Sequence, residues 1–467
     1  MLLTIEKLIY GGDGLARLPA APDTAAPTAA SPATDDARGR GKAVFVPFVL
    51  AAEKIEASLV EQKAGFARAQ ADAIIEPSPH RVQPPCPHFT RCGGCHYQHA
   101  SYEHQLEIKK EILRESLRRL AKLDLPFDVE VHPSPPWNYR NRSRLQVQTE
   151  QVRTEPTFAA GYFKLASHDL LAVEECPISS PLINRGIAAL WQSGRAGKVP
   201  QGVREVEFFA NADDTQLLIE VGCAREARRA AVRDWAEEWR AALPEIAGVV
   251  AFREPNPGDR KASAPEILVT VGAASLTYQT DRASYRVSAG SFFQTNRHLT
   301  GELIKIVTAG QSGKLALDLY AGAGLFSTPL ACDFHHVVSV ESSQTSSVDL
   351  AYNQPPNGET VQATTEQYLA RTMQNTKNVG RTGRDTAIPN KPDLVVVDPP
   401  RSGLGEGVAR SLANLGAPRI IYVSCDPSTL ARDLVPLLAS GYRVEQVHLV
   451  DLFPQTFHLE SVVHLVL

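Results

Sequence analysis

From residue 286 to the C-terminus, short runs of Val, Leu and Ile alternate with helical stretches. The runs are GKLALDLY (313–320), HHVVSVE (335–341), DLVVVDPP (393–400), RIIYVSCD (419–426) and a closing pair at 442–453 and 461–467. Strands that are apolar on both faces are typical of a parallel sheet covered by helices on both sides. The alternation therefore predicts a Rossmann-like α/β domain over residues 286–467.

The rest of the chain predicts two further domains, because 467 residues exceed one ordinary core. Residues 1–75 contain short strands of alternating apolar and polar residues, which favours a small β-barrel. An Ala-, Pro- and Thr-rich stretch at 19–42 predicts a disordered insertion. Residues 76–285, with a helix at 101–123 and then many strands, form the predicted central domain. Residues 371–392 are expected to be a flexible loop.

The composition, 43% hydrophobic and 21% charged, is that of a soluble globular protein. A net charge of −4 argues against nucleic acid coating the whole surface but leaves room for local basic patches. The start, MLLTIEKLIYGGDG, does not resemble a secretion signal, and no apolar run reaches the ~20 residues that span a bilayer. We therefore expect a cytoplasmic protein with reduced thiols, some of which serve metal binding or catalysis.

The segment DLYAGAGLFS (318–327) follows a strand and opens a helix. Gly322 and Gly324 let the backbone turn tightly and approach a ligand, although a strand-to-helix turn without a ligand is the alternative. The next strand ends at Glu341, where a carboxylate can accept both hydroxyls of a ribose. The third glycine of the usual phosphate-binding pattern is replaced by Ser327. S-adenosylmethionine, a nucleoside without phosphate, therefore suits this site better than NAD or ATP.

Two further strand ends carry reactive groups. Asp398 begins DPPRSG after the DLVVV run, and Cys425 follows the RIIYVS run. The carboxyl ends of parallel strands share one rim of a sheet, where ligands bind. A helix N-cap is the alternative role for Asp398. Two other cysteines, Cys223 and Cys332, have no such turn around them and are expected to be packing residues.

The thiol of Cys425 lies where a helix should begin, and a helix N-terminus lowers the pKa of a thiol from its usual value of about 8.5. A thiolate that adds to carbon 6 of a pyrimidine makes carbon 5 nucleophilic enough to take a methyl group from a sulfonium. A base must then remove the proton from carbon 5. Glu460, close to His458 near the C-terminus, is the predicted base, because partial desolvation raises a Glu pKa into the useful range. A solvated strand residue is the alternative.

Together these motifs resemble the RNA uracil-5 methyltransferases, the family that makes 5-methyluridine. The shared motifs, in the family's order, are SFFQTN (291–296), DLYAGAG (318–324), DPPR (398–401), SCDP (424–427) and FPQTFHLESV (453–462). The resemblance covers nearly the whole chain. It implies a class I S-adenosylmethionine-dependent methyltransferase domain with a seven-stranded sheet.

By this resemblance Cys425 is the nucleophile and Glu460 the base. The implied S-adenosylmethionine pocket is lined by Gln294, Tyr320, Glu341 and Asp398. Asp426 stands where many members have Asn, and Ala321 where many have Cys. Neither position carries the reaction, so we expect altered tuning and not lost activity.

Cys86, Cys92 and Cys95 have the spacing C-x5-C-x2-C, and Cys176 is a distant fourth candidate. Four thiolates can hold zinc or an iron–sulfur cluster. Three neighbouring histidines keep the zinc alternative open: His88, His96 and His99. The resemblance favours a 4Fe-4S cluster, because family members with this pattern bind one. Its role would be structural or RNA-contacting, since methyl transfer moves no electrons.

Residues 1–75 resemble the TRAM domain, a small OB-like barrel that grips RNA through shape and charge. Tyr139, Arg140, Arg142 and Arg144 alternate along a predicted strand, an arrangement suited to phosphates beside an aromatic platform. A solvated charged face is the alternative. The target carbon lies in a stacked base, so the uridine must be flipped out.

The sequence thus predicts an enzyme, an RNA (uracil-5-)-methyltransferase acting on structured RNA, with 23S rRNA as the favoured substrate. Methylation of tRNA is the close alternative. An alternative of another class is an iron–sulfur RNA-binding protein with an inactive Rossmann-like half. We expect no membrane association and no obligatory protein partner.

Overall fold

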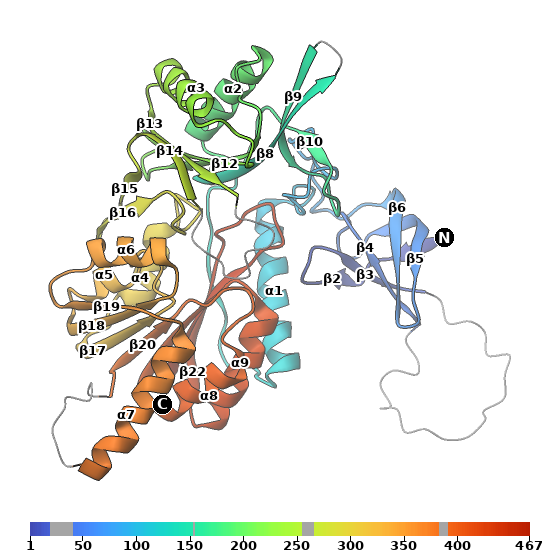
Figure 1. Cartoon of the computed structure of the whole chain (residues 1–467). Helices are drawn as coiled ribbons and strands as arrows, with labels where there is room; N and C mark the ends of the chain where they lie inside the picture. Colours follow the sequence, from blue (N-terminus) through green and yellow to red (C-terminus); the bar gives the residue numbers. More distant parts are fainter. Residues whose placement is uncertain (19–40, 153–154, 255–265, 383–390) are drawn as a thin grey trace, which may run out of the picture. The chain divides into compact units, whose positions relative to one another are not determined.

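The computed structural model describes residues 1–18, 41–152, 155–254, 266–382 and 391–467 (Figure 1). These residues divide into two compact units. The first comprises Met1–Ile112 with Gln455–His458, and the second Leu113–Pro454 with Leu459–Leu467. The predicted insertion at 19–42 lies outside the described residues except for its last two. The division into three domains stays a prediction.

The first unit contains one mixed sheet. Its strands are β1 (Leu2–Thr4), β2 (Lys7–Leu8), β3 (Gly14–Arg17), β4 (Ala43–Val46), β5 (Lys54–Gln62) and β6 (Phe66–Glu76). They pair in the order β1-β5-β6-β4-β3-β2. Alternation places Val44 and Val46 in a small core with Ile55 and Ala67, while the intervening residues of β4 are partly exposed. Short alternating strands over 1–75 are therefore present, and the likeness to a TRAM barrel stays a prediction.

After β6 the chain runs through irregular turns that contain Cys86, Cys92 and Cys95, and then enters helix α1 (Tyr102–Leu120). A second core of the first unit forms where Tyr97 and Ile108 pack with Leu50. Helix α1 begins in the first unit and continues into the second, where its later turns pack on a sheet.

That sheet, in the second unit, has eight strands (Figure 1). They are β7 (Glu130–His132), β17 (Gly313–Leu319), β18 (Phe334–Glu341), β19 (Gly358–Gln362), β20 (Leu394–Val397), β21 (Arg419–Ser424), β22 (Arg443–Val450) and β23 (Glu460–Val466). Their order is β19-β18-β17-β20-β21-β23-β22-β7, and β23 alone is antiparallel to its neighbours among the described strands. The predicted fold class is confirmed, and β7 adds an eighth strand from the region before the domain.

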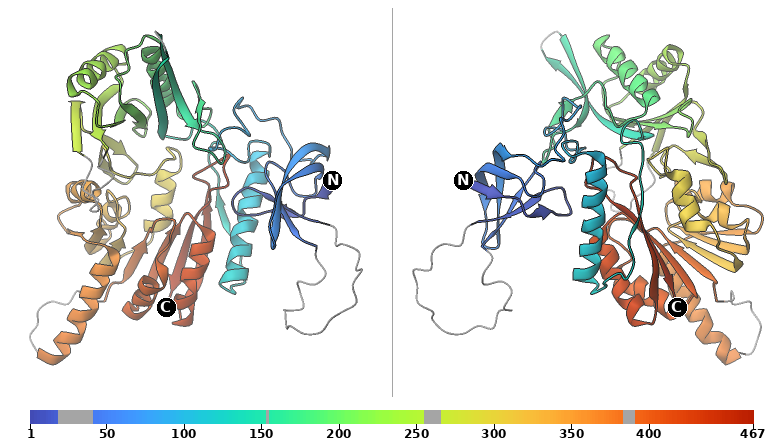
Figure 2. Two further views of the ribbon diagram at one scale, coloured as in Figure 1. Left: turned by 45° about the vertical axis from the view of Figure 1, so that its right-hand side comes forward. Right: turned by 180° about the vertical axis from the view of Figure 1, so that it is seen from behind.

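Helices cover both faces of this sheet (Figure 2). Along β17 and β20, alternate residues face opposite ways: Leu317 and Val395 pack in one core, and Ala316 and Val396 in another. The first core contains side chains of α1, α7 (Thr365–Thr382), α8 (Gly405–Leu415) and α9 (Pro427–Ala439), and the second those of α4 (Thr300–Thr308) and α5 (Ser327–Leu330). Helix α6 (Gln344–Asn353) borders β18 and β19.

Helix α7 corrects the expectation of a loop at 371–392, because the chain stays helical to Thr382. Residues 383–390 of that predicted loop lie outside the described residues. None of the described helices is both long enough and apolar enough to cross a bilayer.

The central region of the chain forms a seven-stranded sheet in the same unit. Its strands are β8 (Arg142–Val152), β9 (Glu155–Phe163), β10 (Leu170–Ala172), β11 (Val203–Ala210), β12 (Leu217–Cys223), β13 (Ile246–Arg253) and β14 (Glu266–Gly272). They pair in the order β10-β9-β8-β11-β12-β13-β14, with α2 (Pro181–Arg195) and α3 (Arg229–Ala242) packed on one face (Figure 1). A two-stranded pair, β15 (Ser275–Gln279) and β16 (Ser284–Ser288), leads on to α4.

The structure separates the two cysteines expected to be packing residues. Cys223, at the end of β12, is fully buried, and burial raises the pKa of its thiol to about 11. Cys332 is exposed in a turn after α5. The packing assignment is therefore confirmed for Cys223 and wrong for Cys332.

Candidate active site

The sheet brings the predicted reactive residues to one rim. Asp398 directly follows β20, and Cys425 directly follows β21. Strand β23 runs antiparallel to β21, with Ser424 opposite Ser461, so its first residue, Glu460, starts beside the end of β21. Pairing of distant strands thus joins two residues that the sequence separates by 35 positions.

The predicted cofactor loop follows β17 at the same rim. Tyr320 has a φ of 64°, a backbone conformation that is uncommon outside glycine and collects at functional sites. Gly322 has a φ of 56°, and a side chain there would meet nothing within 4 Å, so the loop faces open space. The Glu341 carboxylate accepts a hydrogen bond from the Gly322 amide at 2.9 Å and another from the Ser343 amide. Glu341 therefore shapes the loop at the end of β18.

Two aspartates lie at this rim: Asp318 is fully buried, and Asp398 is partly buried. Asp318, in β17, accepts a hydrogen bond from the Ser327 hydroxyl with one oxygen, and its Oδ1 has no hydrogen-bond partner among the described residues. Burial raises the pKa of Asp318 to about 7. Burial, with the neighbouring Asp318 carboxyl, raises the pKa of Asp398 to about 7 as well. Together with Glu341 they form a set of acidic groups that favours a cationic ligand.

The structure reverses the expected effect on Cys425. The helix N-terminus of α9 was expected to lower the pKa of the thiol, but burial and the Glu460 and Asp398 carboxyls raise it to about 12. Asp426, the N-cap of α9, accepts hydrogen bonds from the Ser428 and Thr429 amides and so occupies those helix-terminal donors. In the ligand-free protein, the side chain of Cys425 is therefore a protonated thiol.

Glu460 is buried, and its pKa is raised well above the ordinary value by burial and by the Asp398 carboxyl. Arg401 acts in the opposite direction on both Glu460 and Cys425. Sequence reasoning missed Asp318 and Arg401 as site residues. Both lie inside motifs already noted, DLYAGAG and DPPR, so their place at strand ends was the available signal.

The loop that leads to Glu460 is held by hydrogen bonds from two side chains, Asn296 of the SFFQTN segment and Tyr139. The Asn296 side-chain amide donates to the Leu452 carbonyl at 3.1 Å, and the Tyr139 hydroxyl donates to the Pro454 carbonyl at 3.0 Å. Gln294 is buried in the same segment. Tyr139 is fully buried, so its prediction as an aromatic platform for RNA is wrong.

Comparison with known protein families finds a match over most of the chain. Residues 101–467 match the family model described as tRNA (Uracil-5-)-methyltransferase. The chain belongs to this family. It is an RNA uracil-5 methyltransferase, which the two reactive side chains at the sheet rim had predicted.

Relatives match over almost the full chain. An uncharacterized RNA methyltransferase of Aquifex aeolicus is 30% identical, with 98% of this chain and 97% of the relative covered. The 23S rRNA (uracil(1939)-C(5))-methyltransferase RlmD of Vibrio parahaemolyticus is 30% identical, with 90% of each covered. The crystal structure of Pyrococcus abyssi tRNA (uracil-54, C5)-methyltransferase with S-adenosyl-L-homocysteine has a TM-score of 0.70, 22% identity and full coverage of both chains. That structural likeness supports the fold.

The arginines predicted to bind RNA in this methyltransferase are engaged elsewhere. Arg142 forms ion pairs with Glu207 and Glu220 on the neighbouring strands β11 and β12, and its side chain is largely buried. Arg144 also pairs with Glu207, at 2.6 Å. The expectation that these residues present an open phosphate-binding face is wrong for Arg142, because its guanidinium neutralises buried carboxylates.

The predicted cluster cysteines fall in both units. Cys86, Cys92 and Cys95 belong to the first unit, and Cys176 to the second, where its backbone exchanges two hydrogen bonds with the Asn184 side chain. All seven cysteines lie in the described ranges, and none of them forms a disulfide. Of the three nearby histidines, His96 and His99 are buried enough that their pKa values fall to about 4. His88 is less buried, and its pKa is lowered by burial too.

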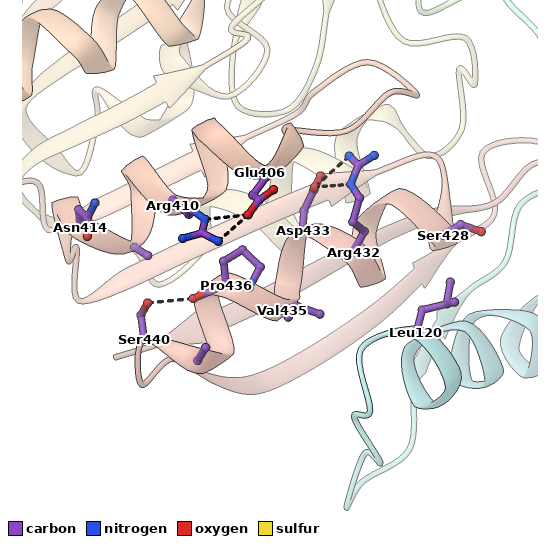
Figure 3. Close-up of a pocket in the computed structure, with 12 residues that line it drawn as sticks. Leu120, Glu406, Arg410, Asn414, Ser428, Arg432, Asp433, Val435, Pro436 and Ser440 are labelled. Carbon is purple, nitrogen blue, oxygen red and sulfur yellow. Dashed lines mark hydrogen bonds and ion pairs between the residues drawn. The ribbon is translucent and has the colours of Figure 1, made fainter. Parts of the chain in front are cut away.

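A groove of about 720 Å³ is lined mainly by residues of α8 and α9 (Figure 3). It is bordered by the Arg410–Glu406 and Arg432–Asp433 ion pairs. None of the predicted site residues lines it. Asp433 has a structural role, since it accepts hydrogen bonds from the Leu404 amide and the Tyr422 hydroxyl.

Proposed function

We propose that this methyltransferase transfers a methyl group from S-adenosylmethionine to carbon 5 of a uridine through a covalent bond to Cys425. The observation that carries the proposal is the meeting of a thiol and a buried carboxyl, Cys425 and Glu460, at the rim that also holds the glycine loop. S-adenosylmethionine supplies the methyl group on a positively charged sulfur. The acidic rim suits a ligand with that charge, as does the Asp318 oxygen that has no hydrogen-bond partner among the described residues.

The cofactor pocket is assigned to Gln294, Tyr320, Glu341 and Asp398. Glu341 at the end of β18 is the proposed acceptor of the ribose hydroxyls, and its hydrogen bond from the Gly322 amide holds the glycine loop beside it. Asp398 supplies negative charge for the sulfonium side. Since carboxyls raise the pKa of Cys425, a cation bound among them lowers it again. We infer that the thiolate forms after the methyl donor binds.

The chemical steps then fall to two side chains. The Cys425 thiolate forms a bond to carbon 6 of the uracil, and the electron pair of the ring's double bond moves to carbon 5. Carbon 5 takes the methyl group while the bond between that methyl group and the donor sulfur breaks, and S-adenosylhomocysteine leaves. Glu460 accepts the proton from carbon 5, the double bond is restored, and the bond between sulfur and carbon 6 breaks. The raised pKa of Glu460 makes its carboxylate a stronger base than an exposed glutamate.

Replacement of Glu460 by Gln tests this scheme. Without the base, the methylated ring cannot lose its proton, so a denaturation-resistant RNA–protein adduct should accumulate on incubation with S-adenosylmethionine and RNA. Cys425→Ala should form no adduct and transfer no methyl group while still binding the donor. Cys223→Ala, which changes a buried thiol outside the site, is the matched control and should keep activity. Methyl transfer by Cys425→Ala would refute the covalent route.

The favoured substrate is 23S rRNA, supported by the RlmD relatives that match nearly the whole chain. The family model is described as a tRNA (Uracil-5-)-methyltransferase, which keeps tRNA as the second candidate. Mapping 5-methyluridine in RNA from cells with and without the gene decides between them. Loss from 23S rRNA supports the proposal, and loss from tRNA alone refutes that substrate.

Cys86, Cys92, Cys95 and Cys176 are the proposed ligands of a 4Fe-4S cluster. Their chemistry suits it, because four thiolates can hold such a cluster and none of these cysteines forms a disulfide. A glycine-containing turn lets the chain pass close to the thiols, since a side chain at Gly94 would lie 3.5 Å from the Cys92 sulfur. A bound cluster would supply rigidity and no chemistry for methyl transfer. Iron and sulfide analysis with the visible spectrum of anaerobically purified protein tests this, and zinc without iron would refute it.

A further inference from the structure

Two histidines and a glutamate meet at the last strand of the eight-stranded sheet. Glu130 and His132 lie in β7, which runs parallel to β22 with Glu130 opposite His448. Alternation puts the side chains of Glu130 and His132 on the same face of β7. Glu302 of α4 approaches from that face. The residues therefore converge from three elements that are far apart in sequence.

Distances among the three groups fit one metal ion. His132 Nε2 lies 3.1 Å from His448 Nδ1. Glu130 Oε1 lies 3.7 Å from the first nitrogen, and Glu130 Oε2 lies 3.5 Å from the second. A tetrahedral zinc ion with bonds of about 2.0–2.1 Å holds its ligand atoms roughly 3.3 Å apart. All three donor atoms lie within 4.8 Å of one another. These separations are close to the edge length of a zinc tetrahedron.

In each ring, the nitrogen that does not face the other histidine lies near an acceptor. His132 Nδ1 lies 3.4 Å from a Glu302 oxygen, and His448 Nε2 lies 3.3 Å from the Gln446 side-chain oxygen. When a proton lies on His132 Nδ1, beside Glu302, and on His448 Nε2, beside Gln446, the facing nitrogens His132 Nε2 and His448 Nδ1 both carry lone pairs. Two lone pairs and a carboxylate then face one point, which a cation would satisfy. Metal-binding histidines in proteins are oriented by acceptors of this kind.

The surroundings are polar and enclosed on one side. The His132 and His448 side chains are mostly buried, whereas Glu130 is 66% exposed and leaves a path for entry from solvent. The ring of His464 in β23 lies 5.3 Å from that of His448, and its Nε2 is buried without a hydrogen-bond partner among the described residues. Two histidines and one carboxylate with an open fourth position are a ligand set typical of zinc and similar ions.

We propose that Glu130, His132 and His448 bind one divalent transition-metal ion of the zinc type, independently of the cysteines and of methyl transfer. The ion joins β7 to β22 at the edge of the sheet. The carbonyl of His132 accepts a hydrogen bond from the Asp451 amide, where the chain leaves β22 for the loop that leads to Glu460. The site therefore braces the strand edge from which that loop departs.

Titration of the full-length, chelator-treated protein with Zn²⁺ tests the site, with heat of binding as the readout. The proposed cluster cysteines can bind Zn²⁺ too. Binding at the histidine site is therefore measured as the difference in heat between wild type and variants that keep all the cysteines. His448→Gln should lack one binding event. Glu130→Gln, a change at an exposed position that leaves folding intact, should weaken that event at least 10-fold. Glu302→Gln should weaken it by about 10–100-fold.

The matched control is His336→Asn, which removes an exposed histidine paired with Glu359 at 3.5 Å in the same sheet. It should titrate like wild type. Thermal melting adds a second readout, since Zn²⁺ should raise the melting temperature of wild type and of the control by more than that of His448→Gln. Identical isotherms for wild type, His448→Gln and Glu130→Gln would overturn the proposal and show that the two rings share a proton instead.

Discussion

Buried carboxyls at the rim of the sheet oppose the stability of the protein. Asp318 is fully buried and Asp398 is partly buried, each with a pKa of about 7, and the pKa of Glu460 is shifted in the same direction. A carboxyl whose pKa rises on folding favours its protonated form in the folded state. No packing requirement explains three such groups at the open ends of strands. The presence of three carboxyls with raised pKa values at one rim therefore indicates that the rim binds a charged ligand.

Asp398→Asn should therefore stabilise the protein increasingly as the pH rises. The folded-state pKa of about 7 exceeds the ordinary value of 3.8, so the contribution of Asp398 is fully present below about pH 4 and is lost as the pH rises through 7. Asparagine does not titrate, and its gain over wild type should reach up to roughly 4 kcal/mol at pH 8. Melting temperatures at pH 5 and pH 8 measure this. Asp333→Asn, at an exposed site, is the control, and a gain independent of pH would contradict the assignment.

At the scale of single residues, the sequence predicted which residues lie at the site better than it predicted their pKa values. Cys425 and Glu460 were recognisable in their motifs, but the thiol pKa was predicted to fall and instead rises. The sequence around Cys425 reveals a helix start. It does not reveal that Asp398 and Glu460 come close, because those contacts depend on strand order.

Helix α9 begins directly after the reactive thiol, so its N-terminus both ends β21 and positions Cys425. The Asp426 carboxylate caps it by accepting from the Ser428 and Thr429 amides at 2.9 and 3.0 Å. Asp426→Ala should destabilise the protein by about 1 kcal/mol, whereas Asp426→Asn should retain the cap. Chemical unfolding of both variants measures this, with exposed Ser428→Ala as the control. Equal stability of the Ala and Asn variants would contradict the capping role.

The same Asn variant separates capping from charge. Asp426 is among the carboxyls that raise the pKa of Cys425, so Asp426→Asn should move the pH dependence of thiol alkylation to lower pH. Alkylation rates of wild type and variant across pH 7–10 measure it. An unshifted profile would mean that the carboxylate at 426 has no influence on the thiol.

Elements were predictable where burial is two-sided. The strands β17, β18, β20 and β21 stand out as continuous apolar runs because helices cover both faces. Strand β19, GETVQ, is partly exposed and polar, and the three residues of β7 join the sheet from far upstream, so neither carries that signal. Residues 371–382 of α7 were taken for a loop, because they contain few apolar residues to mark a helical period.

On the scale of the whole molecule, one short segment of the C-terminal loop belongs to the first unit. Gln455–His458 packs there, whereas the residues on both sides of it belong to the second unit. The His96 and Tyr97 amides both donate to the Gln455 carbonyl. The chain then returns to the second unit, where Glu460 begins β23 two residues later. The segment that precedes Glu460 is therefore anchored, at Gln455, to the chain that follows the cysteine-containing turns.

Gln105 is the centre of that anchor, and Gln105→Ala should loosen the peptide. Its buried amide donates to the Gln455 side chain at 3.0 Å and its oxygen accepts from the Gln455 amide at 2.9 Å. Loss of these bonds leaves buried groups unpaired, at about 1–3 kcal/mol. Amide exchange at 455–458 should quicken, and methyl transfer should fall on the order of 10–100-fold, because the base loses its fixed position, with donor affinity unchanged. Gln279→Ala, at an exposed site on β15, is the control. Faster exchange with full activity would show that Glu460 is positioned entirely within the second unit, through Asn296 and its neighbours.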